Sequence, residues 1–323
     1  MILTSGTVSY LGTSVAIFSL ATIAFIGSVK ILKSWDFNST SNLQYSNEKY
    51  SFLISTIIYF LLMIKIILSF YILYLIDSLV PFIKAAMCGV GVINATSYGW
   101  YLLGLKIILL VLFGLWISAH NKDMQETNYP FLKFKFRFFI LIYLLLIIEL
   151  ILDLQTIIGL DTQRIVSCCS VTFANTNKIG DFISLSRDDM GITFGIVFTL
   201  YFILGVLSYF RQKISIAFGF VSIMMIYTGL LVTIYTFSPY VYELPTHTCP
   251  FCLIQKEYHY IGYAFYILLI FGSFFGIKSG FNYLFLKTLN KKDIILSLAL
   301  NTLFVLIGLY YVLGYYFHNG VWL

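Results

Sequence analysis

Charged residues are scarce in this sequence. Only 11% of its 323 residues are Asp, Glu, Lys or Arg, whereas a soluble domain has about 25%. Hydrophobic residues make up 60% of the chain, and its mean hydropathy is +0.91. This balance excludes an ordinary soluble domain and predicts an integral membrane protein in contact with the lipid bilayer. The net charge of +6 does not indicate nucleic acid as a partner, because the basic residues fall at the ends of apolar segments.

Several motifs that would define a function are also missing. The chain has no Walker motif, no haem-attachment motif and no His pair at metalloprotease spacing. A basic segment ahead of the first apolar stretch is missing too, since the first charged residue is Lys30. We therefore expect that stretch to remain in the mature protein as a helix, and not to act as a cleaved signal peptide.

Eight apolar segments are long enough to cross a membrane, which requires about 20 residues in a helix. They cover approximately residues 9–32, 51–75, 99–119, 138–160, 192–210, 214–237, 260–277 and 294–316. Their length and uniform apolarity favour helices over barrel strands. The sequence thus predicts an all-α fold, in which residues 1–323 form a single integral membrane domain, a polytopic bundle of about eight transmembrane helices.

The basic residues predict the orientation of these helices. Thirteen Lys and Arg residues fall in the loops after the first, third, fifth and seventh spans, and five fall in the opposite loops. Short cytoplasmic loops carry the excess of Lys and Arg. Both termini are therefore expected to be extracytoplasmic, and the chain is expected in the inner (plasma) membrane of a bacterium. The outer loops would then lie at about residues 76–98, 161–191 and 238–259.

All five cysteines lie in these three outer loops. Cys88 is in the first, Cys168 and Cys169 are adjacent in the second, and Cys249 and Cys252 form a Cys-Pro-Phe-Cys motif in the third. Thiols gathered outside the cytoplasm indicate redox or soft-metal chemistry. A structural role is the alternative, because a lone cysteine is typical of small buried residues and a C-x-x-C pair also forms structural disulfides.

The Cys-Pro-Phe-Cys motif stands just before the seventh span and is expected to begin that helix. Cys249 would lie near the N-cap, and Pro250 would occupy the first helical position. The unsatisfied N–H groups and the dipole at a helix N-terminus lower the pKa of a nearby thiol. Lys256 follows Cys252 by four residues, so its charge would further favour a thiolate from the same helix face. Together these features predict a reactive dithiol.

The stretch from Cys249 to Tyr263 resembles the membrane thiol oxidases of the DsbB and vitamin K epoxide reductase type. Those proteins have a C-x-x-C at the outer end of a spanning helix, beside a quinone site. DsbB-like members often continue with Gln-Arg and an aromatic residue, where this chain has Gln255-Lys256 and Tyr258. The resemblance covers about 15 residues. The chain departs from the pattern in its eight spans, in the Lys that replaces Arg, and in having no cysteine after the motif.

This resemblance implies a thiol–disulfide oxidoreductase that passes electrons to a quinone. Cys249 and Cys252 would form the active dithiol, assisted by Lys256. Cys168 and Cys169 would exchange electrons with it or with an extracytoplasmic thiol protein. The vicinal pair fits such a role because strained disulfides are the labile ones.

The same region suits a soft metal ion instead. Thiolates and imidazoles are ligands for Cu(I), Zn or Hg. His247 shares a loop with the C-x-x-C motif, and Cys168 or Cys169 would complete a tetrahedral site. The candidate ligands are Cys88, His247, Cys249, Cys252 and His259. This alternative predicts a metal-handling or transport protein that works with a metal-carrier protein. A structural membrane subunit of a larger complex is the third hypothesis.

Four ionisable residues fall inside the predicted spans: Lys65, Lys106, Glu149 and Asp153. At about 1.5 Å per residue, three of them share a depth of roughly 20 Å from the cytoplasmic end, and Glu149 lies one turn below Asp153 on the same face. Charged groups in a bilayer normally face the bundle interior and pair with one another. The sequence therefore predicts an intramembrane charge cluster, which either joins the helices or forms part of a polar pathway for protons or a substrate.

Overall fold

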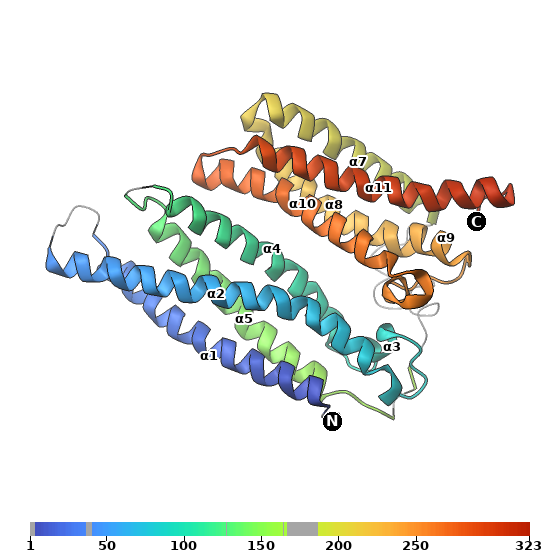
Figure 1. Cartoon of the computed structure of the whole chain (residues 1–323), viewed down its shortest axis with the longest axis horizontal. Coiled ribbons are helices and arrows are strands. Elements are labelled where there is room, and N and C mark those ends of the chain that lie inside the picture. The colour runs from blue at the N-terminus through green and yellow to red at the C-terminus, as the bar shows by residue number, and fades with distance from the viewer. Residues whose placement is uncertain (1–3, 37–40, 127, 164, 167–186) are drawn as a thin grey trace. The chain divides into compact units, whose positions relative to one another are not determined.

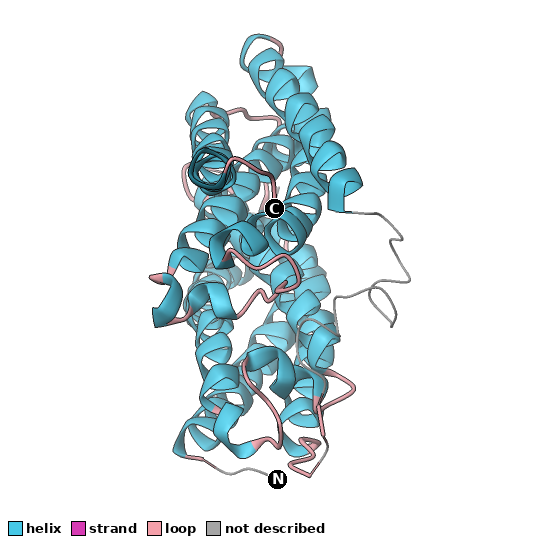
Figure 2. Ribbon diagram, turned by 90° about the vertical axis from the view of Figure 1, so that its right-hand side faces the viewer, coloured by secondary structure: helices cyan, strands magenta, loops and turns pink. Residues whose placement is uncertain are grey.

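The computed structural model describes residues 4–36, 41–126, 128–163, 165–166 and 187–323. Within these ranges every regular element is helical (Figures 1 and 2). The long helices are α1 (Ser5–Ser34), α2 (Asn42–Ser78), α4 (Gly99–Asp123), α5 (Leu132–Ile158), α7 (Arg187–Phe210), α8 (Ser215–Val232), α10 (Ile261–Leu286) and α11 (Lys291–Asn319). Eight helical segments are long and apolar enough to span a membrane, which confirms the predicted polytopic helical bundle.

Two helices extend well beyond their apolar segments. Helix α2 begins at Asn42 and not near residue 51, because the Ser41 side chain caps it by accepting the Gln44 backbone N–H at 3.3 Å. Helix α10 continues to Leu286 and not to about residue 277, and Lys278 in this extension pairs with Asp293 of α11 at 3.0 Å. Apolarity marks where a chain crosses a membrane, whereas a helix ends where capping or backbone geometry stops it.

The chain packs as two compact units. The first comprises Met1–Lys84 and Val92–Val166 and contains α1, α2, α4 and α5, while the second comprises Ala85–Gly91 and Ser167–Leu323 and contains α7 to α11. The short α3 (Gly89–Asn94) lies in the connection between α2 and α4, and Cys88 precedes it directly. Cys88 therefore packs with the second unit, although it lies among the helices of the first in the sequence. Apolarity alone predicts one membrane domain and does not resolve this division.

Each unit has its own interior. Small residues allow close helix packing in the second unit: a Cβ atom on Gly219 of α8 would lie 3.1 Å from the Cα of Gly280 of α10. Large apolar side chains face outward in both units, as shown by Phe60, Ile67 and Phe220, which are 62%, 68% and 64% exposed. Such side chains require a lipid environment, so the chain is an integral membrane protein in contact with the bilayer.

A directed chain of hydrogen bonds joins three helices inside the second unit. Asn301 of α11 donates to the Tyr201 hydroxyl of α7 at 2.8 Å, and the Tyr201 and Ser297 hydroxyl oxygens lie 2.7 Å apart. Ser297 donates to the Gly272 carbonyl of α10. Because the Ser297 proton is used there, Tyr201 must donate to Ser297. The network is uncharged and buried, and it connects α7, α10 and α11.

Candidate functional site

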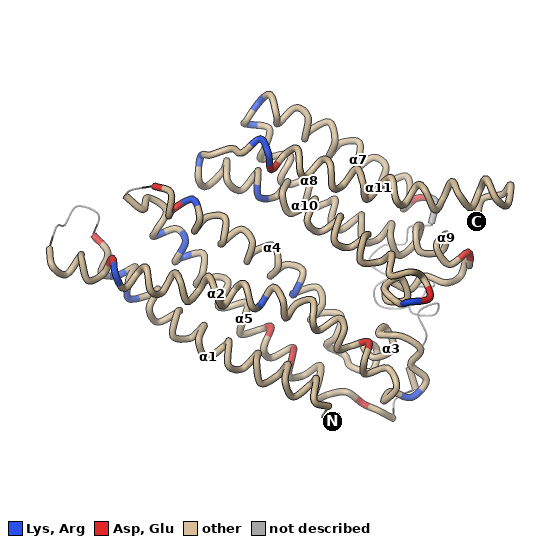
Figure 3. The backbone as a smooth tube through the Cα atoms, viewed as in Figure 1, with Lys and Arg blue, Asp and Glu red and all other residues tan. Residues whose placement is uncertain are grey.

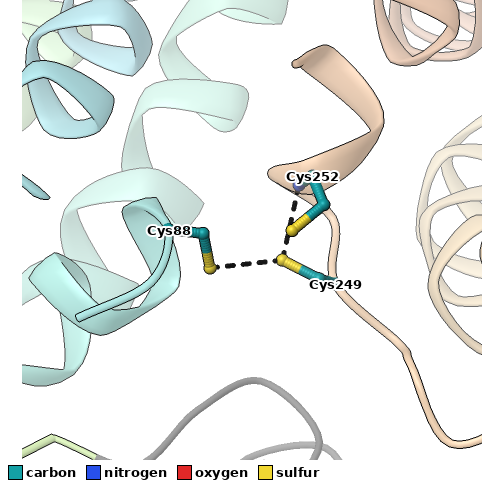
Figure 4. A group of neighbouring side chains, drawn as sticks. All are labelled: Cys88, Cys249 and Cys252. Atoms are coloured by element: carbon teal, nitrogen blue, oxygen red, sulfur yellow. Dashed lines mark hydrogen bonds between the residues drawn. The ribbon is translucent and has the colours of Figure 1, made fainter. Parts of the chain in front are cut away.

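Three of the five cysteines meet in the second unit. The sulfur atoms of Cys88, Cys249 and Cys252 all lie within 4.8 Å of one another, and those of Cys88 and Cys249 are 3.4 Å apart (Figure 4). We call these three residues the thiol cluster. Cys88 and Cys249 are separated by 161 positions in the sequence, so the fold itself assembles the cluster from two distant loops.

The Cys-Pro-Phe-Cys motif forms a tight turn. The Cys252 backbone N–H points to the Cys249 sulfur at 3.4 Å, and a short 3₁₀ segment, η5 (Cys252–Ile254), follows. Two tyrosines hold the turn from neighbouring helices. Tyr242, at the end of α9 (Ser238–Tyr242), donates to the Cys249 carbonyl, and Tyr266 of α10 donates to the Pro250 carbonyl at 2.8 Å. The position of Cys249 is thereby fixed by its own turn and by two side chains.

The expected helix start at this motif is wrong. Helix α10 begins at Ile261, nine residues after Cys252, because His259 and Tyr260 adopt left-handed backbone conformations with φ of 55° and 56°. Cys249 is therefore not near a helix N-cap, and Pro250 is not at a first helical position. The thiols do not receive the dipole and the N–H groups of a long helix, on which the predicted activation of the dithiol depends.

The expected helix-face relation between Lys256 and Cys252 is also wrong. Gln255 has an extended backbone, with φ of −89° and ψ of 162°, and it separates η5 from a second short 3₁₀ segment, η6 (Lys256–Tyr258). The Lys256 side chain is exposed. Its charge is therefore screened by solvent and supports a thiolate at Cys252 only weakly.

Cys88 is held in place through its neighbour Gly89. A Cβ atom on Gly89 would lie 2.6 Å from Cδ1 of Phe251, the residue between the two cysteines of the motif. Only glycine allows the Phe251 ring to approach the backbone this closely. The sequence favoured a small buried residue at Cys88, with metal ligation as the alternative, and burial is confirmed at 2% exposure. The two glycines that follow it, Gly89 and Gly91, were the available sign of a close backbone approach.

The three thiols differ in accessibility. Cys249 is fully buried and Cys88 is 2% exposed, whereas Cys252 is partly buried. Cys252 is therefore the least enclosed residue of the three. In a typical C-x-x-C oxidoreductase the attacking thiolate must be accessible, and here the first cysteine of the motif is the more deeply buried one.

His247 lies beside this turn. Its ring packs against Tyr242 with 4.5 Å between ring centroids, and its Nε2 atom is buried with no hydrogen-bond partner among the described residues. Burial lowers the pKa of His247, and the electrostatic interaction with Cys88 opposes that effect. The imidazole thus lies within electrostatic range of Cys88. His259, in contrast, is exposed, and Cys168 and Cys169 lie outside the described residues.

The four intramembrane charges come together in the first unit. Glu149 of α5 pairs with Lys65 of α2 at 2.8 Å and with Lys106 of α4 at 2.6 Å, and Lys106 also lies 3.3 Å from Asp153. The Tyr10 hydroxyl of α1 donates to Asp153 at 2.8 Å. We call these five residues the charge cluster. Figure 3 shows charged residues in the middle of α2, α4 and α5, while in the second unit they lie toward the helix ends and in the connecting loops.

The charge cluster is balanced and buried. It contains two ammonium groups and two carboxylates, and each of the four charged residues is 5% exposed or less. All four long helices of the first unit contribute at least one member. Because each charge has a partner of opposite sign, the geometry directly supports a role in joining the helices.

No protein-family model, curated protein or solved structure matches this chain.

Proposed function

We propose that the thiol cluster binds a soft metal ion, and that the chain is a membrane protein that handles or transports such ions. The observation that supports this most strongly is the convergence of three sulfurs within 4.8 Å from two distant loops. An ion bound tetrahedrally with metal–sulfur bonds of about 2.3 Å has neighbouring sulfurs about 3.8 Å apart. The three cysteines therefore need only small adjustments to share one ion.

The local environment supports metal binding more than dithiol exchange. Sulfur ligands select Cu(I), Zn and related soft ions. The N–H group of Cys252 points to the Cys249 sulfur at 3.4 Å, so the turn itself holds this sulfur in position for a metal ion. The two most buried thiols would form the interior of the site, and Cys252 would be the ligand through which the ion is exchanged with a metal-carrier protein. The excess of Lys and Arg in the opposite loops supports an exchange outside the cytoplasm, and we propose a bacterial inner membrane as its location.

Metal titration of a simplified protein tests this proposal. Replacing Cys168 and Cys169 with serine leaves the thiol cluster as the only thiols of the chain. In detergent and under reducing conditions, this protein should bind one Cu(I) per chain in competition with a Cu(I) chelator. Replacing Cys88 with serine should lower the affinity at least about tenfold, because a first ligand is lost.

Met87 provides the matched control. It is the neighbour of Cys88, it carries a soft thioether sulfur, and it is 80% exposed. Met87→Leu should leave Cu(I) affinity unchanged. If Cys88→Ser has no more effect than Met87→Leu, the three cysteines do not form one metal site and the proposal fails.

Thiol–disulfide exchange is the second candidate, and the 3.4 Å contact between the Cys88 and Cys249 sulfurs favours it. Two thiols of the cluster would lose two electrons and two protons to a quinone and give one disulfide and one quinol. A disulfide of Cys249 with either neighbour is within reach of the geometry. In the same simplified protein, incubation with a soluble quinone should then consume two thiols per chain and produce a disulfide-linked peptide pair detectable by mass spectrometry.

A further inference from the structure

We infer that His247 is a fourth ligand that the thiol cluster recruits when the bound ion requires four-coordinate geometry. The inference rests on the proposed function and specifies which ions the site accepts. With the cysteines alone the site offers three sulfurs, which satisfies a three-coordinate Cu(I) ion. Zinc-class ions are bound almost always by four tetrahedral ligands. A nitrogen ligand beside the three thiols would extend the site from Cu(I) to Zn²⁺ and similar ions.

The position of His247 in the chain brings it to the cluster. The His247 backbone N–H bonds to the Leu244 carbonyl at 3.2 Å, which forms a turn that ends two residues before Cys249. Tyr242 also connects His247 with Cys249, because its ring contacts the imidazole and its hydroxyl donates to the Cys249 carbonyl. The imidazole is thus held at the edge of the turn that carries two of the three thiols.

The Nε2 atom of His247 is chemically available for this role. A buried polar atom without a hydrogen-bond partner costs free energy, and Nε2 has no partner among the described residues. A bound ion would satisfy it. His247 lies outside the group of ligand atoms that fall within 4.8 Å of one another. Its imidazole must therefore turn toward the sulfurs on binding, which is a side-chain movement in a half-buried residue.

The other candidates near the cluster are less suitable as a fourth ligand. His259, Glu243 and Glu257 are all exposed, and carboxylates are harder ligands than imidazole. His259 also has a left-handed backbone conformation, with φ of 55°, and follows η6 directly in the sequence. It serves as the matched control for His247, since both histidines belong to the same outer loop.

The test compares Co²⁺, a spectroscopic probe for tetrahedral zinc sites, with Cu(I) on the same proteins. His247→Ala should weaken Co²⁺ binding at least about tenfold. Removing a residue that only hydrogen-bonds to a metal ligand already lowers metal affinity about 10–100-fold, and loss of a ligand itself should cost no less. The intense visible absorption of tetrahedral Co²⁺ should be lost as well. Cu(I) affinity should stay within about threefold of the original value, since three sulfurs suffice. His259→Ala should change neither affinity.

The outcomes separate this inference from the proposed function. If the unmodified protein binds neither ion, the proposed function fails. If it binds both and His247→Ala leaves Co²⁺ binding intact, the thiol cluster stands and the role of His247 is overturned. If His247→Ala abolishes the binding of both ions, a His247→Cys variant distinguishes a metal ligand from a structural residue. Restored Co²⁺ binding with a fourth sulfur supports a ligand at this position, and continued loss indicates a purely structural residue and overturns the inference.

Discussion

The two units bury polar groups among their helices in opposite ways. The first unit places two lysines and two carboxylates at its centre, linked into the charge cluster. In the second unit, the hydrogen-bonded chain through Asn301, Tyr201 and Ser297 is uncharged. The ion pair of that unit between Lys278 and Asp293 lies where α11 begins. The thiol cluster belongs to the second unit. The comparison indicates that the charge cluster mainly stabilises its own unit, whereas the proposed metal site belongs to the loops of the other.

Buried ion pairs and buried neutral hydrogen bonds differ in how much stability is lost when one partner is removed. A charge left without its partner in a low-dielectric interior is costly, about 3–5 kcal/mol in buried ion pairs. A neutral hydrogen bond between membrane helices contributes only about 0.6 kcal/mol on average. The first unit should therefore be sensitive to the balance of its charges, and the second should tolerate the loss of any single polar contact.

The largest effect is expected from Lys106→Met. Among the described residues, this change leaves Asp153 with the Tyr10 hydroxyl as its close partner and no ion pair. It should lower the free energy of unfolding by about 3–5 kcal/mol. Adding Asp153→Asn removes the uncompensated charge and leaves the Lys65–Glu149 pair intact. The double variant should therefore recover much of the lost stability. Thermal and denaturant unfolding in detergent measure both, and a double variant no more stable than the single one would contradict the charge-balance account.

Gly89→Ala should have the next largest effect, and it should act on the thiol cluster. The added methyl group would overlap Phe251, and such overpacking typically costs about 1–3 kcal/mol. Because Phe251 lies inside the C-x-x-C turn, metal affinity should fall together with stability. Gly12→Ala is the control, since nothing lies within 4 Å of a Cβ at that position. Equal metal affinity in the two variants would show that Gly89 does not position Cys88.

Tyr201→Phe should have a smaller effect. It removes the hydroxyl from the middle of the neutral network and keeps the ring, which packs 5.1 Å from the ring of Phe218. We expect a loss of about 0.6–1.7 kcal/mol in unfolding free energy, well below that of Lys106→Met. A loss as large as that of Lys106→Met would remove the contrast between the two interiors.

Lys256→Glu should have the smallest effect. The side chain is exposed and belongs to a separate 3₁₀ segment from Cys252. Exposed charges are screened by water and salt, so the Cu(I) affinity of the simplified protein should change by less than about threefold. A change of tenfold or more at moderate salt would restore the direct influence on the thiols that the sequence suggests.

Much of the fold could be predicted from the sequence because crossing a membrane imposes a simple pattern of long apolar runs. The eight spans follow from it, and so does the pairing tendency of Lys65, Lys106, Glu149 and Asp153, because ionisable groups in a bilayer seek partners. The extensions of α2 and α10 could not be predicted in this way, since they depend on the Ser41 cap and on the pair between Lys278 and Asp293.

The site was less predictable. The sequence predicted that Cys88, Cys249 and Cys252 lie on one side of the membrane, and it offered a shared metal site only as an alternative. It could not establish their contact, because that contact depends on how Phe251 packs against Gly89. The helix start expected at Pro250 was wrong because two non-glycine residues, His259 and Tyr260, adopt left-handed backbone conformations. Sequence patterns rarely indicate such conformations outside glycine. The C-x-x-C motif therefore lies in a turn and not at a helix terminus. The proposed dithiol activation loses its main physical basis, and metal binding is favoured instead.

X-ray absorption spectroscopy of the Cu(I)-loaded chain, with Cys168 and Cys169 replaced by serine, tests the central claim most directly. A shared site predicts three sulfur ligands at about 2.3 Å from the metal, and two after Cys88→Ser. A first shell of two sulfurs that Cys88→Ser leaves unchanged, or a shell without sulfur, would contradict the claim that the three thiols form one metal site.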